Sequence, residues 1–158
     1  MFKKSKLILV LFLATSLLVA CGSKGESAEN KGVETSDKKI EGHWYTSGQS
    51  MRGKKVFEEN CAVCHGAKGQ GLVADWKKPD AAGKFPAPPL NGTAHTWHHS
   101  KDLLKRTVNE GGIALGGTMP PFKDNLTDQE KEAVLAHVMS LWPEDIYKVW
   151  QKRNPATK

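Results

Sequence analysis

The chain has 158 residues, 39% of them hydrophobic, and carries 23 Lys and Arg against 17 Asp and Glu, which gives a net charge of +6. This length suits one domain with short additions at its ends. The basic residues form no long Lys or Arg block, which excludes the usual charge pattern of a nucleic-acid-binding protein, so we expect no nucleic-acid partner.

Residues 1–20 have the layout of a secretory signal peptide. Three lysines lie within the first six residues, and an almost uninterrupted apolar run follows from Leu7 to Ala20. This run is short for a membrane span, which needs about 20 apolar residues. We therefore predict a lipoprotein signal peptide over residues 1–20. An uncleaved membrane anchor and an ordinary signal peptide are the alternatives.

The end of this segment, Leu18-Val19-Ala20-Cys21, resembles the bacterial lipobox, in which the cysteine becomes the lipidated first residue of the mature protein. We predict a lipid anchor on Cys21, with the membrane as a partner through that lipid. Either alternative would also place the rest of the chain outside the cytoplasm. We expect an extracytoplasmic protein on a bacterial membrane, at the periplasmic face or the outer face of the cell membrane.

Residues 21–42 are predicted to be a flexible tether. The run 22–32 contains one small apolar residue and no aromatic residue. Such a segment buries too little apolar surface to offset the entropy lost on ordering. The folded domain is predicted over residues 43–154, and residues 155–158 form a short tail.

The first predicted helix covers residues 50–62, where Phe57 and Cys61 lie on one face. The second covers residues 101–110, with Ser100 as its N-cap and a Gly pair after its last residue.

The third predicted helix follows a capping-box pattern that begins at Thr127, and Pro143 ends it. The intervening segments are rich in Pro and Gly, and no run of alternating strand residues occurs. The predicted fold class is therefore all-α, with three to four helices and long loops.

Residues 61–65 read Cys-Ala-Val-Cys-His, the C-x-x-C-H pattern that is typical of covalent attachment of a c-type haem. Each thiol, Cys61 and Cys64, can add to one vinyl group of the haem, and His65 follows where its ring can bind the iron. A redox dithiol or half of a zinc site also uses C-x-x-C. Zinc would need a second pair of ligands, and no further cysteine is available. With Cys21 assigned to lipid, we expect one haem c and no disulfide.

A haem held by His65 needs a second axial ligand or has an open position. The candidates after the motif are two methionines and four histidines: Met119, Met139, His95, His98, His99 and His137. Met139 falls inside the third predicted helix, where a core role suits it better. Met119 lies between a Gly pair and a Pro pair, and the prolines fix the direction of the chain there. We predict Met119 as the second iron ligand.

With these motifs the chain resembles a class I cytochrome c, the monohaem electron carrier with His and Met ligands. The resemblance covers about residues 50–143 and implies the class I cytochrome c fold around one covalently bound haem. It also implies that Gly53 allows a close crossing with the C-terminal helix. His137 stands nearest to the position where the family usually offers an aromatic residue, and we expect its ring to pack rather than to bind a metal.

The segment Ala-Pro-Pro-Leu-Asn-Gly at residues 87–92 is similar to the family's loop that accepts a hydrogen bond from the proximal histidine. The resemblance assigns this carbonyl to Pro88, with Pro89 as the alternative register. Leu90 and Trp97 are expected to pack against the haem.

The resemblance implies a one-electron carrier that cycles between Fe(II) and Fe(III) and is not an enzyme, although it could be a subunit of an oxidoreductase complex. Its partners would be a redox protein donor and acceptor, in the first place membrane respiratory components. A haem enzyme with an open distal site is one alternative. The other is a module that binds copper or another metal through His95, His98 and His99.

Overall fold

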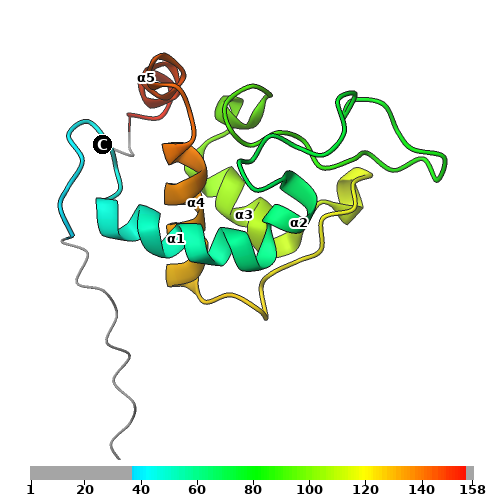
Figure 1. Ribbon diagram of the computed structural model, residues 1–158, viewed down its shortest axis with the longest axis horizontal. Helices are drawn as coiled ribbons and strands as arrows, with labels where there is room; N and C mark the ends of the chain where they lie inside the picture. Colours follow the sequence, from blue (N-terminus) through cyan, green and yellow to red (C-terminus); the bar gives the residue numbers. More distant parts are fainter. Residues whose placement is uncertain (1–36, 156–158) are drawn as a thin grey trace, which may run out of the picture. The chain divides into compact units, whose positions relative to one another are not determined.

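The regular structure of the described part of the chain, residues 37–155, is helical in the computed structural model (Figure 1). The predicted signal peptide, Cys21, most of the predicted tether and the last three residues of the tail lie outside the described residues. Within residues 37–155 no strand forms, and the β-type pairing consists of two isolated bridges. None of these helices is long and apolar enough to cross a membrane. The predicted all-α class is confirmed.

Helix α1, Ser47–Asn60, begins earlier than predicted because Thr46 starts a capping box. The Thr46 hydroxyl accepts from the Gln49 backbone at 3.1 Å, and the Gln49 side chain accepts from the Thr46 backbone at 2.9 Å. The helix ends at Cys61, and the short helix α2, Ala62–His65, follows at once. The C-x-x-C-H motif therefore forms a turn of its own after α1.

Helices α3, Lys101–Glu110, and α4, Asp128–Ser140, confirm the local signals in the sequence. The Ser100 hydroxyl accepts from the Leu103 backbone at 3.2 Å and caps α3, and Gly111 ends the helix with a φ of +78°, a conformation that favours glycine. Thr127 and Glu130 form the predicted capping box of α4. Two further short segments are the 3-10 turns η1, Thr96–His98, and η2, Ile113–Leu115.

Helix α5, Glu144–Arg153, was not predicted from the sequence. Tyr147 and Trp150 lie on one face of it and are almost fully buried. They join a cluster of aromatic and aliphatic side chains that contains Tyr45 and Trp142 together with residues of α3 and α4. Burying two large aromatic side chains explains why this short segment is helical.

Residues 37–42, the end of the predicted tether, contact this helical unit. Lys39 pairs with Thr46 in one of the isolated bridges, and Ile40 packs against the aromatic cluster. Residues before His43 thus also contact the helical unit, because the apolar Ile40 side chain has a surface to pack on.

Helices α1 and α4 pack against each other more extensively than any other pair, and Figure 1 shows them crossing. The crossing point is Gly53, where a Cβ atom would overlap the backbone carbonyl of Ala133. One turn further along, the Phe57 and His137 rings meet edge to face with centroids 5.2 Å apart. The predicted packing role of His137 is confirmed.

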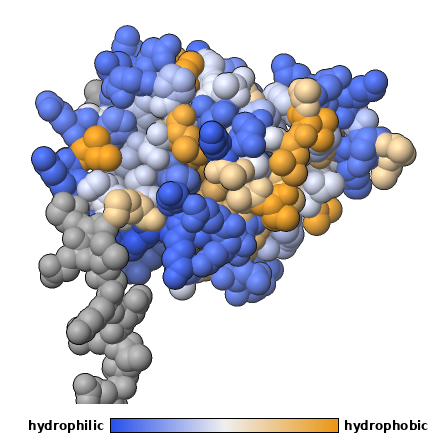
Figure 2. Space-filling view, in the orientation of Figure 1, coloured by the Kyte–Doolittle hydropathy of each residue, from blue (hydrophilic) through white to orange (hydrophobic). Residues whose placement is uncertain are grey.

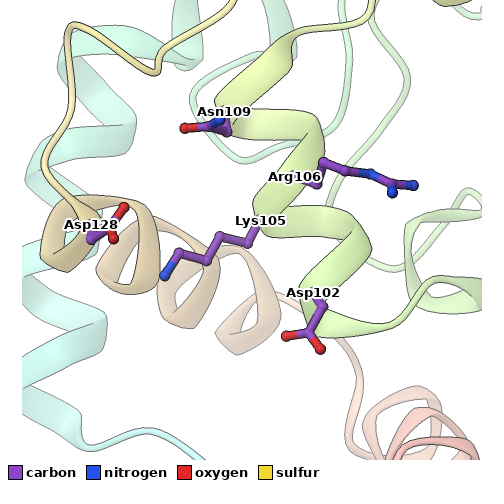
Figure 3. Close-up of a pocket in the computed structure, with 5 residues that line it drawn as sticks. All are labelled: Asp102, Lys105, Arg106, Asn109 and Asp128. Carbon is purple, nitrogen blue, oxygen red and sulfur yellow. The ribbon is translucent and has the colours of Figure 1, made fainter.

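Helices α3 and α4 are also joined by charged side chains. The Glu132 carboxylate pairs with Lys105 at 3.0 Å and with Lys101 at 3.2 Å. The buried Lys131 ammonium donates to the Asn109 side chain at 2.9 Å. Figure 3 shows Lys105 extending from α3 toward α4 across a shallow surface cleft, with Asp128 at the start of α4. These contacts fix the spacing of the two helices at one edge.

Replacing Gly53 tests the close crossing. We expect Gly53→Ala to lower the free energy of unfolding by about 1–3 kcal/mol, since the added methyl group overlaps a backbone carbonyl that cannot rotate away. The measurement is chemical denaturation of the haem-loaded protein.

The matched control is Gly48→Ala in the same helix. There a Cβ atom meets mainly the Asp37 carboxylate, which lies at the end of a flexible, exposed side chain. Alanine favours helix over glycine by up to about 1 kcal/mol, so a Gly53→Ala protein as stable as the control would contradict the close crossing.

Candidate functional site

A cavity of about 580 Å³ opens between α2, α3, α4 and the loops that precede and follow α3. This volume falls within the range of roughly 300–1,000 Å³ that is common for cofactor and small-molecule sites. Most of the lining is apolar and comes from the loops and helices together: Phe85, Leu90, Leu103, Leu104, Val108, Val134, Leu135 and Val138.

The two cysteines of the motif line this cavity. Cys61 is half-buried and Cys64 is exposed, and both are free thiols. Burial, and then the neighbouring Cys64, raise the pKa of Cys61 to about 11. The Cys61 thiol is therefore protonated at neutral pH, and both cysteines line the cavity with thiols that can add to an unsaturated carbon of a bound cofactor.

His65 stands at the cavity wall with one ring nitrogen already engaged. Its Nδ1 donates to the carbonyl oxygen of Pro88, not of Pro89, at 2.9 Å. This bond fixes the tautomer in which Nε2 keeps a free lone pair. Burial lowers the pKa of His65, and the bond to Pro88 opposes this shift. The neutral ring that results is the form that binds a metal.

The loop that carries Pro88 is fixed at three points. The Leu90 backbone donates to the Gly69 carbonyl at 2.6 Å, and the Trp142 indole donates to the Leu90 carbonyl at 2.8 Å. The Thr96 hydroxyl donates to the Pro89 carbonyl at 3.2 Å. Leu90 lines the cavity, as its predicted haem contact requires.

Met119 also lines the cavity, on the loop between α3 and α4. The Gly112 backbone donates to the Met119 carbonyl at 2.9 Å, and the Phe122 backbone donates to the Val108 carbonyl at 3.0 Å, which fixes this loop against the end of α3. Met139, by contrast, is 1% exposed in the core, where its sulfur accepts from the Trp44 indole at 3.0 Å. The core role predicted for Met139 is confirmed.

Trp97, which the sequence placed against the haem, is not among the residues that line the cavity. Its ring packs against the aromatic cluster, with the Arg153 guanidinium 5.4 Å from the ring centre. Its predicted contact with the haem stays a prediction.

Sequence reasoning missed that Trp76 and Lys77 line the cavity, and it considered His95 and His99 only as possible metal ligands, either of the haem iron or in a separate site. All four side chains line the same cavity. The one signal for Trp76 in the sequence is weak: it is a lone tryptophan in a polar loop, and no helical or strand periodicity indicates which way its side chain points. Within residues 37–155 no group of three or more His, Cys, Asp or Glu side chains is arranged to hold a metal ion.

The donor set fits a covalently attached haem. Two thiols, a neutral imidazole with a free lone pair and a thioether sulfur all line one largely apolar cavity. Residues Cys61, Cys64, His65 and Met119 would hold the group, and the apolar side chains would exclude water from it.

Comparisons with known proteins agree with this chemistry. The family model described as "Cytochrome c" matches residues 50–142. The Cbb3-type cytochrome c oxidase subunit CcoP of Azospirillum sp. (strain B510) is 34% identical over 95 residues, which cover 60% of this chain and 29% of that protein. The Cbb3-type cytochrome c oxidase subunit FixP of Sinorhizobium medicae (strain WSM419) is 34% identical over 95 residues, which cover 56% of this chain and 29% of that protein.

Cytochrome c6 of Cladophora glomerata is 36% identical over 87 residues, which cover 54% of this chain and 81% of that protein. The chain thus spans about three tenths of the length of the two oxidase subunits and most of the length of cytochrome c6. No solved structure is similar enough to count as a match.

Removing both attachment points tests whether the cavity needs its cofactor. We expect the Cys61→Ala, Cys64→Ala double variant, prepared without haem, to lose most of its helical circular dichroism, because the loops around the cavity then have no core to pack on. The wild-type holoprotein is the control. A cooperative thermal transition in the double variant would contradict this expectation.

Proposed function

The chain belongs to the cytochrome c family, and on that premise we propose that it transfers electrons outside the cytoplasm while a lipid on Cys21 holds it to a membrane. As a member of the family, the chain is a haem-based electron carrier of the class I c type, with covalently bound haem c. Its axial ligands, location, anchor and partners belong to the proposal.

The iron ligands in this proposal are His65 and Met119. The observation that carries the assignment is that both side chains line one cavity together with Cys61 and Cys64. His65 is oriented by its bond to Pro88, which also increases the basicity of its free nitrogen. The loop of Met119 is held against α3 by backbone hydrogen bonds, so little movement is needed to present its sulfur.

With both positions filled, no substrate binds the iron, and the protein acts as a carrier rather than as an enzyme. The haem supplies one-electron chemistry, as its iron alternates between Fe(II) and Fe(III). The chain holds it in a fixed and largely apolar cavity, where few dipoles rearrange when the charge changes. A sulfur ligand also favours the reduced state relative to a second imidazole.

We propose that redox partners reach the haem at the mouth of the cavity. Val63, Phe85 and Leu115 line the cavity and are 77%, 42% and 78% exposed. Figure 2 shows apolar surface gathered in a band on a face that is otherwise mainly hydrophilic. A small apolar contact of this kind suits a partner that must be released quickly. The similarity to oxidase subunits supports membrane respiratory components as donor and acceptor.

The ligand assignment is tested with two matched methionine variants. We expect Met119→Leu to lose the far-red sulfur-to-iron absorption band of the ferric protein, because leucine has a similar volume but no sulfur. Met139→Leu should keep the band, since Met139 is a core residue. The measurement is the visible spectrum of the purified ferric holoprotein.

A high-spin ferric spectrum in the wild-type protein would refute Met119 as a ligand. It would instead favour the alternative of a haem enzyme with an open distal site.

The anchor is tested at Cys21. We expect Cys21→Ser to move the haem-loaded protein from the membrane fraction to the soluble extracytoplasmic fraction, because serine cannot take the thioether-linked lipid. Ser23→Ala is the matched control and should remain at the membrane. A wild-type mature chain whose mass lacks a lipid would rule out this anchor.

A further inference from the structure

One part of the cavity wall carries basic and aromatic side chains that the proposed function does not use. Trp76 and Lys77 come from the long loop after α2, and His95 and His99 flank η1. The other side chains that line the cavity in residues 37–155 are uncharged at neutral pH, apart from any charge on His65, whose ring is already hydrogen-bonded.

Close ring contacts hold this group together. The His95 ring stacks on Trp76 with centroids 4.9 Å apart and planes 16° apart, and the His99 ring meets His95 edge to face at 5.2 Å. The Lys77 ammonium lies 5.3 Å from the centre of the Trp76 ring. The Trp150 indole donates to the His99 carbonyl at 2.8 Å and fixes the end of η1. The His95 ring therefore has a defined position at the cavity.

The polar contacts of His95 are incomplete in the polypeptide alone. Its Nδ1 is buried and has no hydrogen-bond partner, and among the side-chain atoms of residues 37–155 it is the one buried polar atom in this condition. Buried polar groups in proteins normally have a partner, and each exception needs an explanation, such as a water, an ion or another bound group.

The charges around His95 also lack a counterpart. No acidic side chain lines the cavity within residues 37–155. Burial lowers the pKa of His95, and so do the charged groups that act on it, which are His99, His98 and Lys77, all basic. A haem carries two propionates, which are anionic at neutral pH as other carboxylates are. These anions are attracted to the one basic part of an otherwise neutral cavity, where the low dielectric strengthens the attraction.

We propose that His95, supported by His99 and Lys77, binds a haem propionate, and that protonation of His95 controls the reduction potential of the iron. This inference rests on the proposed function, because it requires a bound, redox-active haem. When a donor protein delivers one electron, ferric iron becomes ferrous and the cofactor loses one positive charge. A cationic His95 is more stable beside the reduced cofactor, so reduction draws a proton from water onto His95, and oxidation returns it.

The direction of the pH dependence follows from these charges. Below its pKa, His95 is cationic and favours the ferrous state, so the reduction potential is high. As the pH rises through that pKa the ring becomes neutral and the potential falls. The potential stops falling when His95 is neutral in both oxidation states. Histidine rings titrate mainly between about pH 5 and pH 8, so the change should lie in that interval.

The experiment measures the reduction potential of the haem-loaded protein from about pH 5 to pH 8 in a buffer without phosphate. We expect the wild-type potential to fall with rising pH. It should be nearly independent of pH in His95→Phe, which keeps a ring to stack on Trp76, and in His95→Gln, which keeps a hydrogen-bond donor that does not titrate. His98→Phe is the matched control and should keep the wild-type slope, because His98 is exposed and does not line the cavity.

A second measurement follows the His95 ring protons by NMR, and we expect a higher pKa for this ring in the ferrous protein than in the ferric protein. The inference is overturned if the wild-type potential does not change with pH, if both His95 variants keep its slope, or if the ring has the same pKa in both oxidation states. If the reduction potential depends on pH only after phosphate is added, the residues around His95 bind a dissolved anion instead of a propionate, and the inference is overturned too.

The far-red band, recorded on the same samples, separates this inference from the proposed function. If the far-red band is intact but the slope of the reduction potential with pH does not depend on His95, only this inference is overturned. A wild-type protein without the band removes the ligand assignment as well.

Discussion

The direct contact of the α1 and α4 backbones at Gly53 and Ala133 fixes the site. Because α1 continues into α2 after a single residue, Cys61, the position of α1 on α4 determines where the C-x-x-C-H turn stands. The same α4 presents Val134 and Val138 to the cavity. One short-range contact between two helices thus sets both the attachment points of the cofactor and one wall of its cavity.

The cofactor completes a core that the chain leaves divided. One cluster centres on Phe57 and Val134, and the other on Tyr147 and Trp150. The cavity lies beside them and is closed largely by loops, which bury little of their own surface. A bound haem offers these loops two broad apolar faces, and this explains how long segments rich in Pro and Gly can be ordered in so small a domain.

The features that could best be predicted from the sequence are those that depend only on neighbouring residues. The ends of α3 and the capping box of α4 are local, so Ser100 and Thr127 could be recognised without tertiary information. Helix α5 was missed because Pro143 was taken only as a stop signal, whereas it also precedes a new first turn with two acidic residues. In the site, the thiols, His65, Pro88 and Met119 were predicted as residues of one cavity because each lies in a short, distinctive motif.

The wall around His95 could not be predicted, since it depends on how a loop and a 3-10 turn meet. Successive side chains of a 3-10 turn point about 120° apart. Thr96 is buried at the cavity, so the next residue, Trp97, is turned away from it and packs near Arg153. The sequence placed Trp97 against the haem edge because it lies in the loop that leads to the second predicted helix. Among the tryptophans it is Trp76, from a different loop, that lines the cavity, and its ring stacks on His95. The register of η1 therefore decides which side chains of this segment line the cavity.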